Sequence, residues 1–235
     1  MQQNVLTPKQ KFLKNFSSFL SSRGKLLLLL LILLILTIIG IAIYSEMRSS
    51  IIEKSTVLLE EVEDKYGSEF SNLSENMDEK KKTEIMETIL SSLDDIIGKY
   101  SNYYAGQRAL FMKGEVYFAD KQYDKAAENY SAFANKYKKS YLAPISLNNI
   151  AVCHEELGDN DAAISYYKKI TEAYSNDFPN IPRVLFSLGR LYETKEDFNT
   201  AMEYYNMISD KYADSDWTIL SKNRIIFLKG AGKIK

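Results

Sequence analysis

The stretch "KYSNYYAGQRALFMKGEVYF", residues 99–118, decides the fold because close variants of it return three times further along the chain. The variants are "KYKKSYLAPISLNNIAVCHE" (136–155), "AYSNDFPNIPRVLFSLGRLY" (173–192) and "KYADSDWTILSKNRIIFLKG" (211–230). When the four copies are aligned on Tyr100, Tyr137, Tyr174 and Tyr212, the spacings are 37, 37 and 38 residues. A fixed period of this length predicts an array of repeated structural units.

A small residue marks the same place in each of the first three copies. Gly114, Ala151 and Gly189 each precede the next aligned tyrosine by 23 residues, and Ile226 stands at this place in the last copy. The one extra residue falls between Tyr174 and Gly189, around the polar stretch "SNDFPNIP". Loops tolerate an insertion that packed helices do not, so we expect a loop there.

The apolar positions within each unit recur at helical steps. Leu110, Gly114 and Tyr117 follow each other by four and three residues, and so do Ala126, Tyr130 and Phe133 after the polar turn "ADKQYD". This spacing places the three residues of each run on one face of a helix. Each unit is therefore predicted to be a helical hairpin of about 37 residues, and hairpins that cannot bury their apolar faces alone stack into a solenoid.

Small residues should allow the two helices of a hairpin to pack closely, and tyrosines should fill the space between hairpins. The residues predicted to pack in this way are Gly114, Tyr117, Ala126, Tyr130, Ala151, Ala163, Tyr167, Gly189, Tyr192, Ala201 and Tyr205.

The order of these residues resembles the tetratricopeptide repeat (TPR) family: a small residue, tyrosine three later, alanine nine after that, and an aromatic four further on. "GEVYFADKQYDKAAENYSAF" and "GRLYETKEDFNTAMEYYNMI" match the pattern, whereas "AVCHEELGDNDAAISYYKKI" has Ala151 in place of glycine and His154 in place of the aromatic. The resemblance covers residues 84–229. The period exceeds the usual 34 residues, as in the repeats of bacterial envelope proteins such as outer-membrane assembly lipoproteins and Tol-Pal-associated periplasmic proteins.

The predicted fold is all-α: a TPR-type helical-hairpin solenoid of about three repeats plus capping helices, behind one N-terminal transmembrane helix. Its predicted parts are a basic tail (1–25), the span (26–44), a linking helix or degenerate first unit (45–83) and the array (84–235). Residues 45–80 carry an apolar stripe, which implies a partner helix in the degenerate unit, a stalk or a short coiled coil. The stripe consists of Ile51, Leu58, Val62, Tyr66, Phe70, Leu73 and Met77. The last helix, within 217–230, is expected to cap the array with an outer face of Lys222, Asn223 and Arg224.

Residues 26–44, "LLLLLLILLILTIIGIAIY", contain no charged residue. As a helix they would reach about 28 Å, close to the hydrocarbon thickness of a bilayer. A cleaved signal peptide is the alternative, although its apolar region is usually shorter. Five basic residues and no acidic ones precede the span: Lys9, Lys11, Lys14, Arg23 and Lys25. We therefore predict a single-pass inner-membrane protein with a cytoplasmic N-terminus and a periplasmic array. The basic segment "KQKFLKNFSSFLSSRGK" could also lie on anionic lipid as an amphipathic segment, although its simpler interpretation is a topology signal.

The residues that could carry chemistry are few. A single cysteine, Cys153, and a single histidine, His154, cannot build a zinc site, and as neighbours on a helix they do not face each other. "GAGK" (230–233) lacks the rest of a phosphate-binding loop, so we expect a disordered tail. We predict no enzyme, no cofactor and no small-molecule substrate, and the net charge of −1 gives no indication of nucleic acid.

Function is then predicted to lie in protein binding. By the family pattern, the first helix of each unit lines a groove in which a peptide or a partner helix could bind. The candidate groove residues are Arg108, Phe111, Glu115, Phe118, Asn148, Val152, Glu155, Arg183, Phe186, Arg190 and Glu193. They could equally be ordinary exposed helix residues.

The layout of tail, span and repeats resembles the ancillary subunits of the SecYEG translocon. That resemblance implies the translocon or periplasmic chaperones as partners. An envelope scaffold for cell division or outer-membrane assembly is the alternative, and an adaptor facing the cytoplasm is a third.

Overall fold

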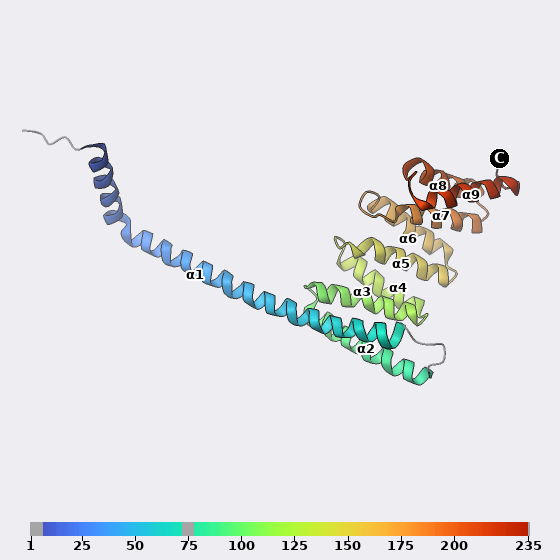
Figure 1. Cartoon of the computed structure of the whole chain (residues 1–235), viewed down its shortest axis with the longest axis horizontal. Coiled ribbons are helices and arrows are strands. Elements are labelled where there is room, and N and C mark those ends of the chain that lie inside the picture. Colours follow the sequence, from blue (N-terminus) through green and yellow to red (C-terminus); the bar gives the residue numbers. More distant parts are fainter. Residues whose placement is uncertain (1–6, 72–77, 235) are drawn as a thin grey trace, which may run out of the picture. The chain divides into compact units, whose positions relative to one another are not determined.

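The structure is a computed structural model that describes residues 7–71 and 78–234, and within these ranges all regular structure is helical. The chain divides into two compact units, residues 1–54 and 55–235 (Figure 1). The helix α1 (Pro8–Lys65) contributes to both, and each unit is described by itself.

The first unit consists of the N-terminal part of α1. The helix begins with a reciprocal cap, because the backbone amide of Thr7 donates to Oε1 of Gln10 (3.0 Å) and the amide of Gln10 donates to Oγ1 of Thr7 (3.4 Å). Within the described residues, the helix that contains 26–44 is the one element long and apolar enough to cross a membrane. Within residues 26–44 every leucine and isoleucine except the partly exposed Leu27 is exposed, with Leu33 at 59%. This stretch is a candidate membrane span.

The second unit begins with the last turns of α1, a π-helix η1 (Tyr66–Ser71) and α2 (Glu79–Tyr100). Leu59, Val62 and Phe70 are buried in one cluster with the apolar face of α2, so these turns pack as the partner of α2. The α-helical geometry ends at Lys65, where η1 begins. Leu73 and Met77 of the predicted stripe lie outside the described residues, and the predicted array boundary at residue 84 falls inside α2.

Three helical hairpins and a final helix follow, and Figure 1 shows them stacked in chain order. They are α3 (Tyr104–Ala119) with α4 (Tyr123–Lys136), α5 (Leu142–Glu156) with α6 (Asn160–Ala173), α7 (Ile181–Thr194) with α8 (Phe198–Lys211), and the single helix α9 (Asp216–Gly230). The core runs from the second hairpin into the third, because one cluster joins residues of α5 and α6 to residues of α7 and α8. The all-helical solenoid predicted from the sequence is confirmed.

The small residues lie where a large aromatic ring crosses the hairpin. A Cβ atom placed on Gly114 would be 2.7 Å from Cε1 of Tyr130, and Gly189 lies in the same way against Tyr205. The rings of Tyr130, Tyr167 and Tyr205 are almost fully buried, at 2% exposure or less. The first helix can therefore approach the second closely only because its side chain at this point is hydrogen or methyl.

Two of the aligned tyrosines tie their connecting loop to the loop of the preceding unit. The hydroxyl of Tyr137 donates to the carbonyl oxygen of Ser101 (2.7 Å), and the hydroxyl of Tyr174 donates to that of Lys138 (3.1 Å). Both bonds span 36 residues, one fewer than the 37-residue repeat. These bonds give a reason for tyrosine at positions 137 and 174.

The first helix of each hairpin, and α9 as well, ends in the same left-handed turn. Lys121, Gly158, Glu196 and Gly232 all have a positive φ between 59° and 77°. In each case the next residue's amide donates to a carbonyl five residues earlier, as when Lys233 donates to Leu228 at 2.9 Å. This is a Schellman turn. The expectation of a disordered "GAGK" tail was therefore wrong, since Gly232 forms this turn and Ile234 is buried beyond it.

The outer face of α9 also differs from the expectation. Its exposed side chains include four large apolar residues, Ile219, Leu220, Ile226 and Phe227. Lys222 and Asn223 are exposed as expected, but Arg224 is turned toward α7 and binds Glu193. The cap is therefore less polar than the sequence suggested.

Candidate protein-binding surface

The candidate groove lies on α3, α5 and α7, the first helices of the three hairpins. Of its eleven predicted residues, Arg183 and Arg190 are exposed and Phe111 is buried. The other eight are partly exposed: Arg108, Glu115, Phe118, Asn148, Val152, Glu155, Phe186 and Glu193.

Phe111 does not belong to this surface, which corrects the prediction. It is 3% exposed and packs edge-on against Tyr130 and Phe133, with ring centroids 5.3 and 5.6 Å away. The reason is helical geometry: Phe111 precedes Gly114 by three residues and so shares the face of α3 that packs on α4.

At the start of the candidate groove, Arg108 joins two carboxylates. Its Nη1 donates to Oε2 of Glu115, which lies seven residues further along α3 (2.6 Å). Its Nε lies 2.9 Å from Oε1 of Glu63 on α1. The Arg108 side chain is only 21% exposed. Such charge-assisted bonds in a partly buried place fix the guanidinium rather than leave it free for a partner.

A chain of tyrosine, glutamate and arginine links the second and third hairpins to the helix that follows. The hydroxyl of Tyr167 on α6 donates to Oε1 of Glu155 on α5 (2.7 Å), and Glu155 also binds Arg190 of α7. One repeat later, the hydroxyl of Tyr205 donates to Oε1 of Glu193 (2.5 Å). Each glutamate therefore connects the two helices of its own hairpin with the first helix of the next unit.

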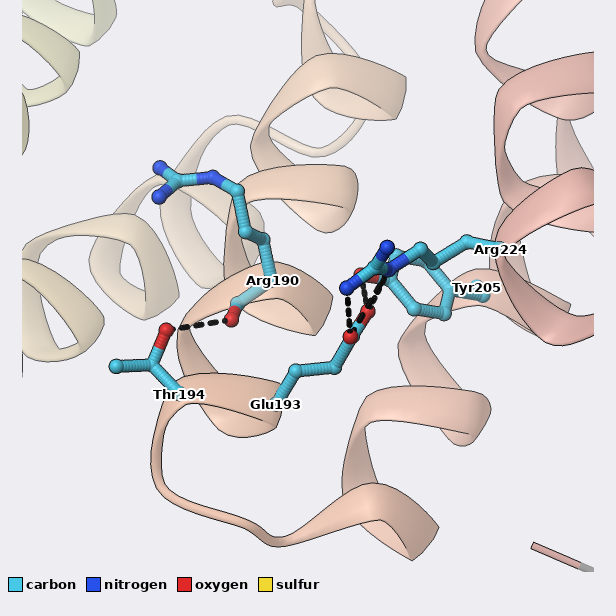
Figure 2. A network of polar contacts seen from close by, with 5 residues as sticks. All are labelled: Arg190, Glu193, Thr194, Tyr205 and Arg224. Carbon is cyan, nitrogen blue, oxygen red and sulfur yellow. Dashed lines mark hydrogen bonds and ion pairs between the residues drawn. The ribbon is translucent and has the colours of Figure 1, made fainter. Parts of the chain in front are cut away.

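Figure 2 shows the second of these links. Arg224 of α9 binds Glu193 with a bidentate fork, its Nε 2.7 Å from Oε1 and its Nη2 2.5 Å from Oε2. The Glu193 side chain is 7% exposed, so its charge is compensated within the protein. The guanidinium of Arg190 points away from this cluster, consistent with its pairing to Glu155.

The tyrosines in these links stay protonated. Burial is the main cause that raises the pKa of Tyr167 above its ordinary value, and the hydrogen bond to Glu155 adds to it. Burial and then the bond to Glu193 raise the pKa of Tyr205 in the same way. Both hydroxyls therefore serve as permanent donors to the glutamates.

The remaining groove residues form the part of the surface that is not taken up by ion pairs. Arg183 is exposed at the start of α7, and Phe186 lies between the rings of Tyr205 and Trp217 with one part open to solvent. Asn148 and Val152 are partly exposed one unit earlier on α5. Phe118 packs edge-on against Tyr123, 5.3 Å between centroids.

Sequence reasoning missed the role of Arg224, because it treated α9 as a plain cap. A signal was present: each linking glutamate follows the small residue by four positions and precedes its tyrosine by twelve, as Glu155 does Tyr167 and Glu193 does Tyr205. In the first hairpin this position holds Phe118, so the hydroxyl of Tyr130 has no glutamate there and instead bonds Asn149.

The two residues that could carry chemistry are both engaged in packing. Cys153 is fully buried, and burial raises the pKa of its thiol to about 12. His154 stacks on the ring of Tyr166 at 5.4 Å, with its Nδ1 3.6 Å from Oδ2 of Asp159. Residues 7–71 and 78–234 contain no group of three or more His, Cys, Asp or Glu side chains that could hold a metal ion.

Comparison with known proteins identifies the repeat. The tetratricopeptide repeat-like domain family matches residues 17–215. This chain belongs to that family. The TPR resemblance inferred from the small residues and tyrosines is therefore confirmed, while none of the comparisons bears on the resemblance to translocon subunits.

Two curated relatives match about half of their own length to this chain. A TPR repeat-containing protein of Treponema pallidum is 30% identical over 118 residues, which cover 50% of this chain and 48% of that protein. An uncharacterized protein of Borreliella burgdorferi is 27% identical over 169 residues, 57% of this chain and 48% of that one. The chain thus spans about half the length of the curated relatives it matches.

Solved structures show the same architecture. The apo form of RapI matches with a TM-score of 0.54 at 15% identity, and the match covers 73% of this chain and 46% of the RapI chain. The TPR-like repeats of a Podosopora anserina protein have a TM-score of 0.50 at 12% identity, covering 65% of this chain and 82% of theirs. At these identities the likeness shows the fold alone.

Proposed function

We propose that this protein is a non-enzymatic, membrane-anchored TPR scaffold that binds another protein through the candidate groove. One observation supports the groove above other surfaces. The Tyr–Glu–Arg links hold α5, α7 and α9 together and neutralise the buried glutamates, and beside them Arg183, Phe186, Asn148 and Val152 remain partly or fully open.

The chemistry of this open part favours a peptide or helix with an apolar anchor and a nearby acid. Phe186 offers an aromatic face that is already supported from behind by Tyr205 and Trp217, so it need not be ordered on binding. Arg183, three residues earlier and on the same side of α7, supplies a positive charge. An exposed aromatic beside an arginine is typical of the residues that dominate protein interfaces.

Residues 26–44 supply the anchor in this proposal. Exposed leucines and isoleucines surround this stretch of helix, and such an apolar surface is unfavourable in water. Five basic residues and no acidic residue precede the stretch. This asymmetry favours a cytoplasmic N-terminus and an array on the far side of the inner membrane. The Sec translocon or periplasmic chaperones are the proposed partners. A scaffold for division or outer-membrane assembly would use the same groove for another subunit.

A site-specific photo-crosslinker at position 183 tests the groove in intact membranes. We expect it to form an adduct whose partner mass spectrometry can identify, while the same crosslinker at Glu203, exposed on α8, forms none. Replacement of Arg183 by Glu should weaken capture of that partner, and Lys211→Glu, exposed at the end of α8, should not. Equal adducts at positions 183 and 203 would argue against a groove.

The identity of the adduct separates the proposed partners. A translocon subunit or a chaperone supports the first, whereas a division or outer-membrane assembly protein supports the scaffold. A C-terminal reporter fusion that is active only in the cytoplasm would reverse the proposed orientation and make the array a cytoplasmic adaptor.

A further inference from the structure

The segment before the span, residues 8–23 of α1, has features of an independent helix. Its start is defined locally by the reciprocal cap between Thr7 and Gln10, with Pro8 at the first helical position. Proline at this position lacks an amide that would have no partner in any case. The sequence thus directs a helix to begin here, well before the apolar stretch that starts at residue 26.

The side chains of this segment are divided between two faces. Five large apolar residues follow each other by steps of one and three and fall on one side of the helix. All five are about half exposed or more: Phe12, Leu13, Phe16, Phe19 and Leu20. Phe12 and Phe16 stack on each other with centroids 6.1 Å apart, as neighbours on one face do.

The opposite side is basic and polar. Lys11 and Lys14 lie there with Ser17 and Ser21, whose hydroxyls donate back to helix carbonyls at 3.0 Å. The first acidic residue of the chain is Glu46, so nothing in this segment offsets the positive charge. This charge is complementary to anionic lipid headgroups.

The helix also changes direction before the span. Figure 1 shows the dark-blue N-terminal part of α1 set at an angle to the rest of the helix. In the sequence, Ser22 and Gly24 come just before the apolar stretch that starts at residue 26. The Ser22 hydroxyl donates to the carbonyl of Phe19 at 3.1 Å. Serine bonds to the preceding turn and glycine are recognised causes of a helix bend. A straight helix would instead project residues 8–23 about 24 Å along the axis of the span.

We propose that residues 8–23 lie in the plane of the membrane on an anionic lipid surface, with Phe12, Phe16 and Phe19 inserted between the headgroups and Lys11 and Lys14 facing the phosphates and water. This proposal rests on the membrane anchoring proposed above. The bend of α1 before the span lets the segment leave the span axis. The helix would hold the chain to the bilayer by a second contact, beyond the span itself.

Spin labels on the full-length protein in vesicles test this arrangement. Cysteines are introduced one at a time from position 11 to position 20 in a Cys153→Ala background, and the protein is placed in vesicles of phosphatidylcholine with phosphatidylglycerol. Accessibility to oxygen, which concentrates in lipid, is compared with accessibility to a water-soluble nickel complex. We expect oxygen accessibility to peak at 12, 16 and 19 and nickel accessibility to peak at 11, 14 and 18, with a period near 3.6 residues.

A label at Leu33 separates this proposal from the anchoring on which it rests. If the Leu33 label is deep and all labels from 11 to 20 are equally accessible to nickel, the in-plane helix is refuted while the span stands. If all of them are deep, the segment belongs to a longer span, which also refutes it. A Leu33 label accessible to nickel would overturn the anchoring and this inference together.

Charge reversal tests the choice of lipid. In Lys11→Glu/Lys14→Glu the labels at 12 and 16 should shift toward nickel accessibility in the vesicles that contain phosphatidylglycerol. Ser17→Ala/Ser21→Ala, a change of two residues on the same face without a charge, should leave them unchanged. Loss of depth in both variants, or in neither, would contradict a charge-dependent lipid contact.

Discussion

Replacing Gly114 by alanine should destabilise the array although alanine is the better helix former. Alanine in a helix interior is favoured over glycine by about 1 kcal/mol. Against this gain, the new Cβ would lie 2.7, 2.8 and 2.9 Å from three carbon atoms along one edge of the Tyr130 ring. The ring is 2% exposed and packs edge-on against Phe111, so the whole ring must move. Overpacking of this kind costs about 1–3 kcal/mol.

The expected net effect is a loss of about 1 kcal/mol. Ala151 carries a Cβ at the equivalent place and Tyr167 is still buried there, which argues that the cost lies in the lower part of the range. Gly98→Ala on α2 is the matched control, because its Cβ would meet nothing within 4 Å. It should stabilise by up to about 1 kcal/mol. The two variants should therefore differ in melting temperature by roughly 4–8 °C.

Thermal unfolding of the full chain in detergent, followed by far-UV circular dichroism, measures this difference. Tyr130→Leu removes the ring edge, so the penalty of Gly114→Ala should disappear in that background. If Gly114→Ala raises the melting temperature as much as Gly98→Ala does, the ring is not fixed and the role assigned to the small residues is wrong.

Three further predictions concern buried polar groups. Tyr205→Phe removes the hydroxyl that donates to Glu193 and should lower the free energy of unfolding by about 1 kcal/mol in the same assay. Burial acts to raise the pKa of Asp120, but hydrogen bonds from Lys82 and Gln122 hold this pKa below its ordinary value. Ionised Asp120 therefore stabilises the folded chain at a pH above its unfolded pKa of about 4, and this stabilisation is lost as the pH falls. The destabilisation by Asp120→Asn should accordingly shrink toward pH 3 in acid titrations of the melting temperature. Cys153, with its pKa raised to about 12, should react with maleimide at pH 8 about a thousandfold more slowly in the folded chain than in denaturant.

Each of these three predictions has a control variant or a result that would contradict it. Tyr204→Phe, on the partly exposed side of α8, should change stability little, and an equal loss would dissociate the effect from Glu193. Asp94→Asn removes an ion pair whose carboxylate is 57% exposed, so its effect should be near zero at every pH. Labelling of folded Cys153 at the denatured rate would show that α5 opens readily.

The fold could be predicted from the sequence because the contacts that define it repeat. Gly114 and Tyr130 meet for the same geometric reason as Gly189 and Tyr205, so a spacing seen several times carries the information of several independent observations. The chain ends lack this redundancy. The turn at Gly232 copies those at Gly158 and Glu196, but the sequence around it does not, and it was taken for a disordered tail.

The candidate groove was harder to predict because exposure depends on the angle between neighbouring hairpins. Whether a charged residue on one first helix reaches the next is set by the rise and rotation from unit to unit, which a helical wheel does not contain. For Phe111 the family pattern gave a wrong groove position, whereas the three-residue spacing from Gly114 would have placed it on the buried face. The period does not predict the pairing of Arg224 with Glu193, because these two residues are 31 positions apart, which is less than one repeat.

This use of charge within the array narrows what a partner can recognise. Glu155 and Glu193 look in the sequence like acidic residues offered to a basic ligand, yet both are largely buried and already bound to tyrosine and arginine. A ligand that paired with these glutamates would have to break their charge-assisted bonds to arginine and leave a guanidinium without its partner. The free energy lost in this way would be comparable to the free energy gained from the new pair. Specificity in the groove must then come from residues outside these links. On α7 that leaves the exposed charge of Arg183 beside the supported ring of Phe186, and a partner that binds there should carry an acidic and an apolar side chain at matching distance.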